Sequence, residues 1–370
     1  MNHLKSWIWL MFPLALLGVS CNESTDGGVF RSFDSGETWE QITVVSGSTE
    51  GIQTISQENI LAMTFHPQDP NIIYIGTREN GLYLTLTGGE NWYQSDITTG
   101  TIRSIAVDPV DPSNVYMAKD KTVLKSTDEG LTWETVYTDV QGGTITALAV
   151  DSFEHSRVYA GTSSGTVVKS ADYGVSWDLR MQIGDGIEQL LVAPHDTRIV
   201  YVLTDEQTLY RSVTGGEIPE GSIAEDINQG WTELVTKAVK EQFDNAHKVV
   251  QISLDVNDPS VLYTVTRRGL MRGANNGEDW SDIITLVGVD DKQNDDVRSV
   301  STVVGKPNEL YFTLGHIIHK SVDGGATWKV IENFPSSRKI YQYLIDPQTP
   351  NVMYAGMYKE EEQRGLIKRN

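Results

Sequence analysis

Two arginines of this 370-residue sequence stand in nearly the same local sequence and could bind an anion. Arg103 lies in Ile-Arg-Ser-Ile and Arg298 lies in Val-Arg-Ser-Val. A guanidinium group can donate two parallel hydrogen bonds to one carboxylate, and it also binds sugar hydroxyls well. Glu188 and Tyr341 occupy the matching position in other repeats, so the four side chains predict a site for a carboxylate or a sugar. The arginines could instead pair with Glu188 or face water.

Three carboxylates are candidates for acid and base catalysis of glycoside hydrolysis: Glu188, Asp205 and Glu206. Such catalysis needs two carboxyl groups about 5–10 Å apart, and the sequence does not fix their separation. The seven histidines show no metal-binding spacing, and no glycine-rich loop opens a helix after a strand. The sequence therefore predicts neither a metal nor a cofactor.

A further set of aspartates belongs to an eight-residue pattern, Ser-x-Asp-x-Gly-x-Thr-Trp, which we name the turn motif. The carboxylate can accept backbone N–H groups of a tight turn, and the glycine supplies a positive φ. We therefore expect a structural role for its aspartates, Asp34, Asp128, Asp172 and Asp323. Intact copies occupy 32–39, 126–133, 170–177 and 321–328, degraded copies occupy 85–92 and 273–280, and a seventh copy is split by an insertion between 212 and 231.

The turn motif marks a repeat of forty to fifty-odd residues that fills most of the chain. Every Trp outside the first twenty residues occupies its last position. A short apolar run precedes each motif, and a Trp-headed run follows it. Two more β-rich runs joined by an Asp-Pro turn lie upstream, as in 102–108 and 115–118. Each repeat therefore predicts four antiparallel strands, which make one blade of a β-propeller.

We predict an all-β fold, a single seven-bladed β-propeller over residues 29–370. Six full units run from about 59 to 332. The C-terminal end offers strands without a turn motif, and residues 29–43 offer a turn motif without the first two strands. The two ends therefore complete one composite blade, and this closure leaves no exposed sheet edge. Apolar residues at helical spacing predict a short helix within 233–246, which could be a lid over the propeller or a docking element.

The turn motif resembles the Asp-box, or BNR repeat, of sialidases. With the Asp-Pro turns it is similar to the propellers of sortilin-type receptors, xyloglucan-cleaving glycoside hydrolases and the photosystem II assembly factor. The resemblance implies the fold, whereas function in such proteins resides in loops carried by the blades. The sequence has no sialidase-like Arg-Ile-Pro segment, has the length for one propeller only, and is acidic rather than basic.

In such propellers the Asp-boxes lie on one face, and the opposite face is the usual place for function. Aligning the repeats on their first strands puts one residue per blade at the mouth of the central channel on that opposite face. These residues are Leu61, Arg103, Thr146, Glu188, Val250, Arg298 and Tyr341. Loops expected on the same face add Arg78, Asp205, Glu206, Arg267, Arg268 and residues 358–362.

Four aspartates crowd a short segment between two repeats: Asp290, Asp291, Asp295 and Asp296. Carboxylate oxygens bind Ca²⁺, but this spacing does not match an EF-hand loop. A solvated acidic loop is the alternative.

The first twenty residues predict a secretory signal. Lys5 precedes an apolar run of about 13 residues, which is too short to span a bilayer as a helix. Small residues before Cys21, the only cysteine, resemble a bacterial lipoprotein signal, so we expect lipidation at Cys21 and a polar tether over 21–28. Cleavage nearby that leaves Cys21 as a free thiol is the alternative.

Composition excludes several functions. The formal net charge of −21 provides no broad cationic surface for nucleic acid, and one cysteine excludes an intramolecular disulfide framework. We therefore expect an exported, lipid-anchored and non-catalytic propeller in the cell envelope of a bacterium. It would bind an envelope protein or a polysaccharide, in isolation or as a subunit of a membrane-associated complex. The alternative is a glycoside hydrolase with its site on the face opposite the turn motifs. The sequence does not indicate an oligomeric state.

Overall fold

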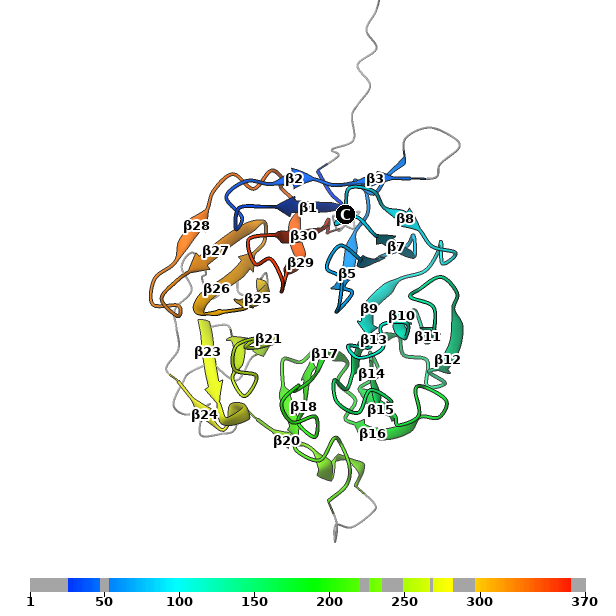
Figure 1. Cartoon of the computed structure of the whole chain (residues 1–370). Helices are drawn as coiled ribbons and strands as arrows, with labels where there is room; N and C mark the ends of the chain where they lie inside the picture. The colour runs from blue at the N-terminus through cyan, green and yellow to red at the C-terminus, as the bar shows by residue number, and fades with distance from the viewer. Residues whose placement is uncertain are drawn as a thin grey trace, which may run out of the picture.

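Seven four-stranded antiparallel sheets form a ring in the computed structural model, which confirms the predicted seven-bladed β-propeller. Figure 1 shows the sheets arranged around a common centre. The structure describes residues 26–46, 53–219, 226–234, 249–266, 269–281 and 297–360. Within these ranges the only helices are two short 3₁₀ segments, Ile227–Gly230 and Asn275–Gly277.

Each blade places one strand beside the centre of the ring and a second strand next to it. The innermost strands are β5 (Ile60–Phe65), β9 (Ile102–Val107), β13 (Ile145–Val150), β17 (Ile187–Val192), β21 (Val249–Leu254), β25 (Val297–Val303) and β29 (Lys339–Ile345). The second strands are β6 (Ile73–Thr77), β10 (Val115–Lys119), β14 (Val158–Thr162), β18 (Val200–Thr204), β22 (Leu262–Thr266), β26 (Lys306–Leu314) and β30 (Met353–Tyr358).

The two outer strands of each blade flank the turn motif. The third strands are β7 (Leu82–Thr85), β11 (Thr122–Ser126), β15 (Thr166–Ser170), β19 (Leu209–Ser212), β23 (Gly269–Ala274), β27 (Ile317–Ser321) and β1 (Val29–Ser32). The fourth strands are β8 (Tyr93–Gln94), β12 (Glu134–Thr138), β16 (Asp178–Gln182), β20 (Thr232–Glu233), β24 (Asp279–Trp280), β28 (Lys329–Ile331) and β2 (Glu40–Gln41).

The closing blade takes strands from both ends of the chain, as expected. Its order is β2-β1-β30-β29, and β1 pairs with β30 from Val29↔Gly356 to Ser32↔Met353. Figure 1 shows the blue N-terminal strands β1 and β2 beside the orange and red strands β29 and β30. This pairing joins the two ends of the chain through a ladder of backbone hydrogen bonds, which leaves the ring without an open edge.

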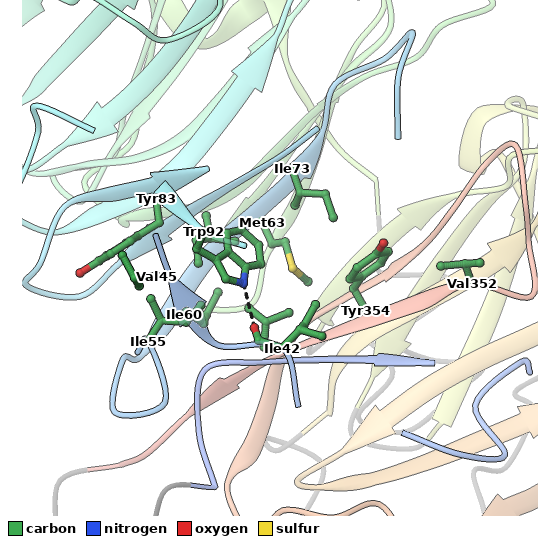
Figure 2. Close-up of a cluster of buried hydrophobic side chains, with 12 residues drawn as sticks. Ile42, Val45, Ile55, Ile60, Met63, Ile73, Tyr83, Trp92, Val352 and Tyr354 are labelled. Carbon is green, nitrogen blue, oxygen red and sulfur yellow. Dashed lines mark hydrogen bonds between the residues drawn. The ribbon is translucent and has the colours of Figure 1, made fainter. Parts of the chain in front are cut away.

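A two-stranded ribbon after the closing blade was not predicted. It consists of β3 (Val44–Val45) and β4 (Gln53–Thr54). The ribbon covers Trp92 of the first blade, whose backbone N donates to the Val44 carbonyl at 2.8 Å and whose Nε1 donates to the Ile42 carbonyl at 2.8 Å. Figure 2 shows this indole enclosed by apolar side chains from the ribbon, the first blade and the closing blade. The segment that follows the closing blade therefore seals it against its neighbour.

The turn motif forms the same hydrogen bonds in each intact copy. In the copy at 126–133, Asp128 accepts from the backbone N of Thr132 at 2.8 Å and from its hydroxyl at 2.7 Å. The Ser126 hydroxyl donates to Asp128 at 2.7 Å and accepts from the Gly130 N at 2.8 Å. Gly130 has φ +90°, which a side chain would strain. The side chains of the motif therefore close the turn on itself.

One backbone bond per blade joins the turn motif to the hairpin between the first and second strands. The donor N–H groups and acceptor carbonyls are Gly88 and Asn71, Glu129 and Ser113, Tyr173 and Ser156, Gly215 and Arg198, Asn276 and Ser260, Gly324 and Asn308, and Ser35 and Asn351. The two kinds of turn therefore lie on one face of the ring, which we name the motif face. Because the strands are antiparallel, the connections between blades lie on the other face, which we name the mouth face.

Tyrosines of the second strands join each blade to the next one. The hydroxyl of Tyr74 donates to the Glu129 carbonyl at 3.0 Å, and the hydroxyl of Tyr116 donates to the Tyr173 carbonyl at 3.1 Å. Both tyrosines are fully buried, and both acceptors belong to the turn motif of the following blade. These two tyrosines, at the same position of the repeat, therefore join their blades to the next ones.

Several predicted features lie outside the described residues. They are the signal at 1–20, Cys21, most of the tether at 21–28, most of the helix expected within 233–246, Arg267, Arg268, the acidic segment at 290–296 and residues 361–362. At the start of the expected helix, Glu233 ends β20 and Leu234 is buried. No helix in the described part of the chain is long and apolar enough to cross a membrane.

Candidate functional site

Every innermost strand carries a β-bulge near its first residue, and the bulged residue is the one that the repeat alignment placed at the channel mouth. In β9, for example, Ser104 pairs with Ala118 and Ile102 pairs with Lys119, so Arg103 has no partner in the ladder. The bulged residues are Leu61, Arg103, Thr146, Glu188, Val250, Arg298 and Tyr341. A bulge re-aims one side chain relative to its strand. The fold therefore places one backbone bulge per blade near the start of its innermost strand.

A cavity of about 320 Å³ occupies the channel where these strands begin. All seven innermost strands contribute to its walls, which include the bulged residues Leu61, Arg103, Thr146, Glu188 and Tyr341. The alignment did not single out the remaining polar lining, namely Gln189, Gln251, Ser253, Ser299, Ser301 and Gln342. Several of these residues directly follow the bulged residue in the sequence. Including the next position of each repeat in the alignment could therefore have identified them.

Part of the polar lining serves to join neighbouring blades. Gln189 accepts from the Ile252 N at 2.9 Å, and Gln342 donates to the Leu61 carbonyl at 2.7 Å. The hydroxyl of Thr146 donates to the Ile187 carbonyl at 2.5 Å. These side chains connect adjacent innermost strands, so they hold the channel open at a fixed width.

Arg103 and Glu188 are the charged residues of the cavity, and both are exposed. Within the described residues, neither side chain forms an ion pair or a hydrogen bond with another group of the protein. The two charges are of opposite sign and come from the second and fourth blades. They are therefore available to a ligand that carries both a carboxylate and a donor group. Arg298 occupies the equivalent bulge in the sixth blade.

Tyr341 and Arg78 meet through a third residue, Tyr358. The rings of Tyr341 and Tyr358 lie 5.3 Å apart at 35°, and Arg78 donates to the Tyr358 hydroxyl at 3.2 Å. Arg78 follows β6 in the first blade, whereas both tyrosines belong to the closing blade. The cluster places a flat aromatic surface and a cation at the seam where the ring closes.

A second hollow of about 230 Å³ adjoins the channel and brings two of the three candidate catalytic carboxylates together. Glu188 and Asp205 line it, along with Thr204 and Gln207. Asp205 packs over Gly186, where an added Cβ would lie 2.5 Å from its Oδ2. Gln207 has φ +67°, and its buried side-chain oxygen has no hydrogen-bond partner in the described part of the chain. Glu206 is exposed and is not among the lining residues.

The motif aspartates have a different environment. Hydrogen bonds from the Thr or Ser hydroxyl and backbone N–H four residues later lower the pKa of Asp128, Asp172 and Asp323 to about 2. The same bonds lower the pKa of Asp34. These carboxylates accept hydrogen bonds from groups of their own turns, and they lie on the face opposite the cavity.

No group of three His, Cys, Asp or Glu side chains that could hold a metal ion occurs in the parts of the chain that the structure describes. The acidic segment at 290–296, for which calcium was one interpretation, lies outside those parts.

The ring of four-stranded blades with a polar channel mouth defines the chain as a seven-bladed β-propeller. No family model matches the sequence. A xyloglucanase of Paenibacillus sp. is 26% identical over 229 residues, a match that covers 48% of this chain and 21% of that enzyme. The chain therefore corresponds to about a fifth of that relative.

Solved structures share the architecture at lower identity. YCF48 bound to D1 peptide superimposes with a TM-score of 0.59 at 16% identity, covering 86% of this chain and 100% of that chain. The GH74 xyloglucanase from Xanthomonas campestris gives a TM-score of 0.60 at 16% identity, covering 87% of this chain and 52% of that one. These likenesses establish the fold, and the chain resembles both a peptide-bound propeller and part of a glycoside hydrolase.

Proposed function

We propose that this protein is a non-catalytic binding propeller that receives a polypeptide of the cell envelope at its channel mouth. The bulges carry the proposal, because the bulged residues of five blades line a common polar cavity. Arg103 and Glu188 have no partner among the described residues, and the aromatic surface of Tyr341 lies at the rim. Charges of both signs beside an aromatic ring suit a polar peptide segment.

The comparisons support a peptide ligand. One of the similar solved structures, YCF48, is described with a bound D1 peptide, and the match covers the whole of that chain. The xyloglucanase of known structure is nearly twice the length that this chain covers. A single ring therefore matches the peptide-bound relative better than it matches the whole enzyme. A polysaccharide of the envelope is the other ligand that these polar groups would accept.

We further propose that the protein is exported and lipid-anchored at Cys21, and that it acts as a scaffold subunit in the bacterial envelope. The support is the signal-like segment at 1–20 and the small residues that precede the only cysteine. Mass spectrometry of the N-terminal peptide from membranes tests the anchor. A diacylated Cys21 supports it, and a free thiol or a different N-terminus contradicts it.

The binding proposal is tested by screening peptides from envelope proteins, and envelope polysaccharides, against the purified propeller. We expect Arg103→Ala and Glu188→Ala each to weaken binding of the selected ligand by about tenfold or more, because each removes a charge-assisted hydrogen bond worth roughly 1.5–3 kcal/mol. Arg198→Ala and Glu134→Ala are matched controls, because Arg198 lies on the motif face and Glu134 on an outer strand. Equal losses in the controls would contradict a site at the channel mouth.

A glycoside hydrolase is the second candidate function, and one observation favours it. Glu188 and Asp205 line the same hollow, and acid–base hydrolysis requires such a pair. The assay is hydrolysis of xyloglucan and a panel of aryl glycosides. Turnover that Glu188→Gln abolishes would establish the enzyme and overturn the non-catalytic proposal, whereas no turnover across the panel supports binding.

A further inference from the structure

The first described residue, Asp26, is fixed to the propeller by several hydrogen bonds. Its carboxylate accepts from Arg338 Nε at 3.1 Å and from the Ser337 hydroxyl at 3.0 Å, and its carbonyl accepts from the Ser336 hydroxyl at 2.7 Å. Arg338 is only 6% exposed, so this contact is part of the folded body. The tether therefore has a defined exit point.

The exit point lies on the mouth face. Residues 336–338 form the connection that enters β29, and β29 begins beside the bulge at Tyr341. Gly27 donates to the carbonyl of Ser56, in the segment that leads to β5. From there β1 runs across the blade to its turn motif at 32–39 on the opposite face. The N-terminal segment therefore leaves the ring on the side where the channel cavity opens.

The length of the tether limits where Cys21 can be. Four residues lie between Cys21 and Asp26, which makes five steps along the chain. An extended chain spans at most about 3.6 Å per step, so Cys21 lies within about 18 Å of Asp26 in any conformation. A six-residue innermost strand such as β13 is itself about 20 Å long. The tether is therefore too short to pass around the ring and anchor it by the motif face.

We infer that the lipid at Cys21 holds the mouth face towards the membrane, and that the channel mouth receives a segment of a protein embedded in that membrane. This inference rests on the proposed lipid anchor. A gap of about 18 Å or less admits an extended chain or a single helix about 10–12 Å wide. It excludes a folded domain about 30 Å across, so the partner contributes a loop or a terminus close to its membrane-spanning part.

Site-specific labelling tests the orientation, because lipidation leaves no free thiol in the natural chain. Val140 is 92% exposed in a connection on the mouth face, and Val175 is 84% exposed in a turn motif. Lipidated Val140→Cys and Val175→Cys proteins are labelled with a fluorophore and bound to phosphatidylethanolamine–phosphatidylglycerol vesicles that carry nitroxide headgroups. We expect quenching several-fold stronger at position 140. Equal quenching, or stronger quenching at 175, overturns the inference.

The outcome is distinguishable from failure of the anchor. If mass spectrometry shows that Cys21 carries no lipid, the proposed anchor fails before any vesicle is used. If Cys21 is lipidated and quenching favours position 175, the anchor stands and the orientation is wrong. Soluble protein with Cys21→Ser, which should not bind the vesicles, gives the unquenched baseline for both labels.

A photo-cross-linker tests the kind of partner. A photo-cross-linking amino acid replaces Tyr341 in cells that express the lipidated protein. In the control, the same amino acid replaces Val175. We expect adducts from position 341 with a polypeptide that carbonate washing leaves in the membrane, and fewer adducts when a 20-residue Gly-Ser insert follows Cys21. A longer tether lowers the effective concentration of the mouth at the membrane. Adducts only with soluble proteins or polysaccharide, or adducts that the insert does not change, contradict the inference.

Discussion

The two faces of the ring use the same kinds of side chain in opposite ways. On the motif face, Asp128 and its equivalents accept hydrogen bonds from their own turns, and backbone bonds join those turns to the neighbouring hairpins. On the mouth face, Glu188 and Arg103 extend from bulges into a cavity and bond to no described group of the protein. A carboxylate on the first face is part of the framework, whereas a carboxylate on the second face is available to a ligand.

The turns of the motif face also carry exposed apolar side chains. Three of the most exposed large apolar side chains, Leu131, Phe153 and Val175, lie in turns of the motif face. The polar groups of these turns are already paired within the protein, so the repeated turn tolerates any side chain at these outward positions. The comparison teaches that repetition marks the structural face, and that variation at one fixed position, the bulge, marks the candidate functional face. Four predictions test this division.

The largest effect is expected at the seam between the first and the closing blade. Trp92→Ala should lower the free energy of unfolding by about 3–5 kcal/mol, because it removes a fully buried indole and leaves a cavity. Trp133→Ala is the matched control in an intact motif, where the indole is half-buried and bonds only within its own turn at 3.1 Å. Urea unfolding measures both. Equal losses would show that the ribbon does not seal the ring.

The next prediction contrasts the two faces directly. Ser126→Ala should destabilise the fold by about 1–3 kcal/mol, because the hydroxyl is buried and serves both Asp128 and the Gly130 N. Glu188→Ala should change stability by less than about 0.5 kcal/mol, as surface substitutions without partners do. Only the second variant should lose ligand. If the Ser126→Ala protein were fully folded but bound the ligand more weakly, the division between the two faces would be contradicted.

Two buried tyrosines at the same position of the repeat offer a finer test. The hydroxyl of Tyr116 donates to a carbonyl of the next blade, whereas the buried hydroxyl of Tyr201 has no partner within the residues that the structure describes. Tyr116→Phe should therefore cost about 1 kcal/mol. Tyr201→Phe should cost nothing or stabilise the protein, because it removes a buried polar group that has no hydrogen bond. Thermal unfolding of both variants measures the difference, and equal destabilisation would contradict the role of this tyrosine in joining blades.

The sequence predicted the ring because the same spacing of motif residues recurs in every blade. Seven tryptophans at one motif position count the blades, and the alignment that they impose identified the residue in each blade that proves to be bulged, such as Arg103 and Tyr341. The ribbon at Val44 and the contact of Arg78 with Tyr358 were not predictable in this way. Both lie where the first blade meets the closing one, and these contacts depend on ring closure rather than on any local pattern. Whether the mouth residues bind a ligand remains a prediction.

The smallest effect concerns acid stability, and it tests the role of the aspartates on the motif face. The pKa of Asp128, Asp172 and Asp323 is about 2 in the folded protein and near 3.8 when unfolded. Because the folded pKa is depressed, these groups contribute stability above about pH 4, and the contribution is lost as the pH falls towards 2. The effect is modest because the carboxylates are exposed to solvent.

In urea titrations across this pH range, the triple variant Asp128→Asn, Asp172→Asn, Asp323→Asn should lose less stability than the natural protein. The single variant Asp128→Asn should recover part of that difference. A triple variant with the same pH dependence of stability as the natural protein would contradict this role of the motif aspartates.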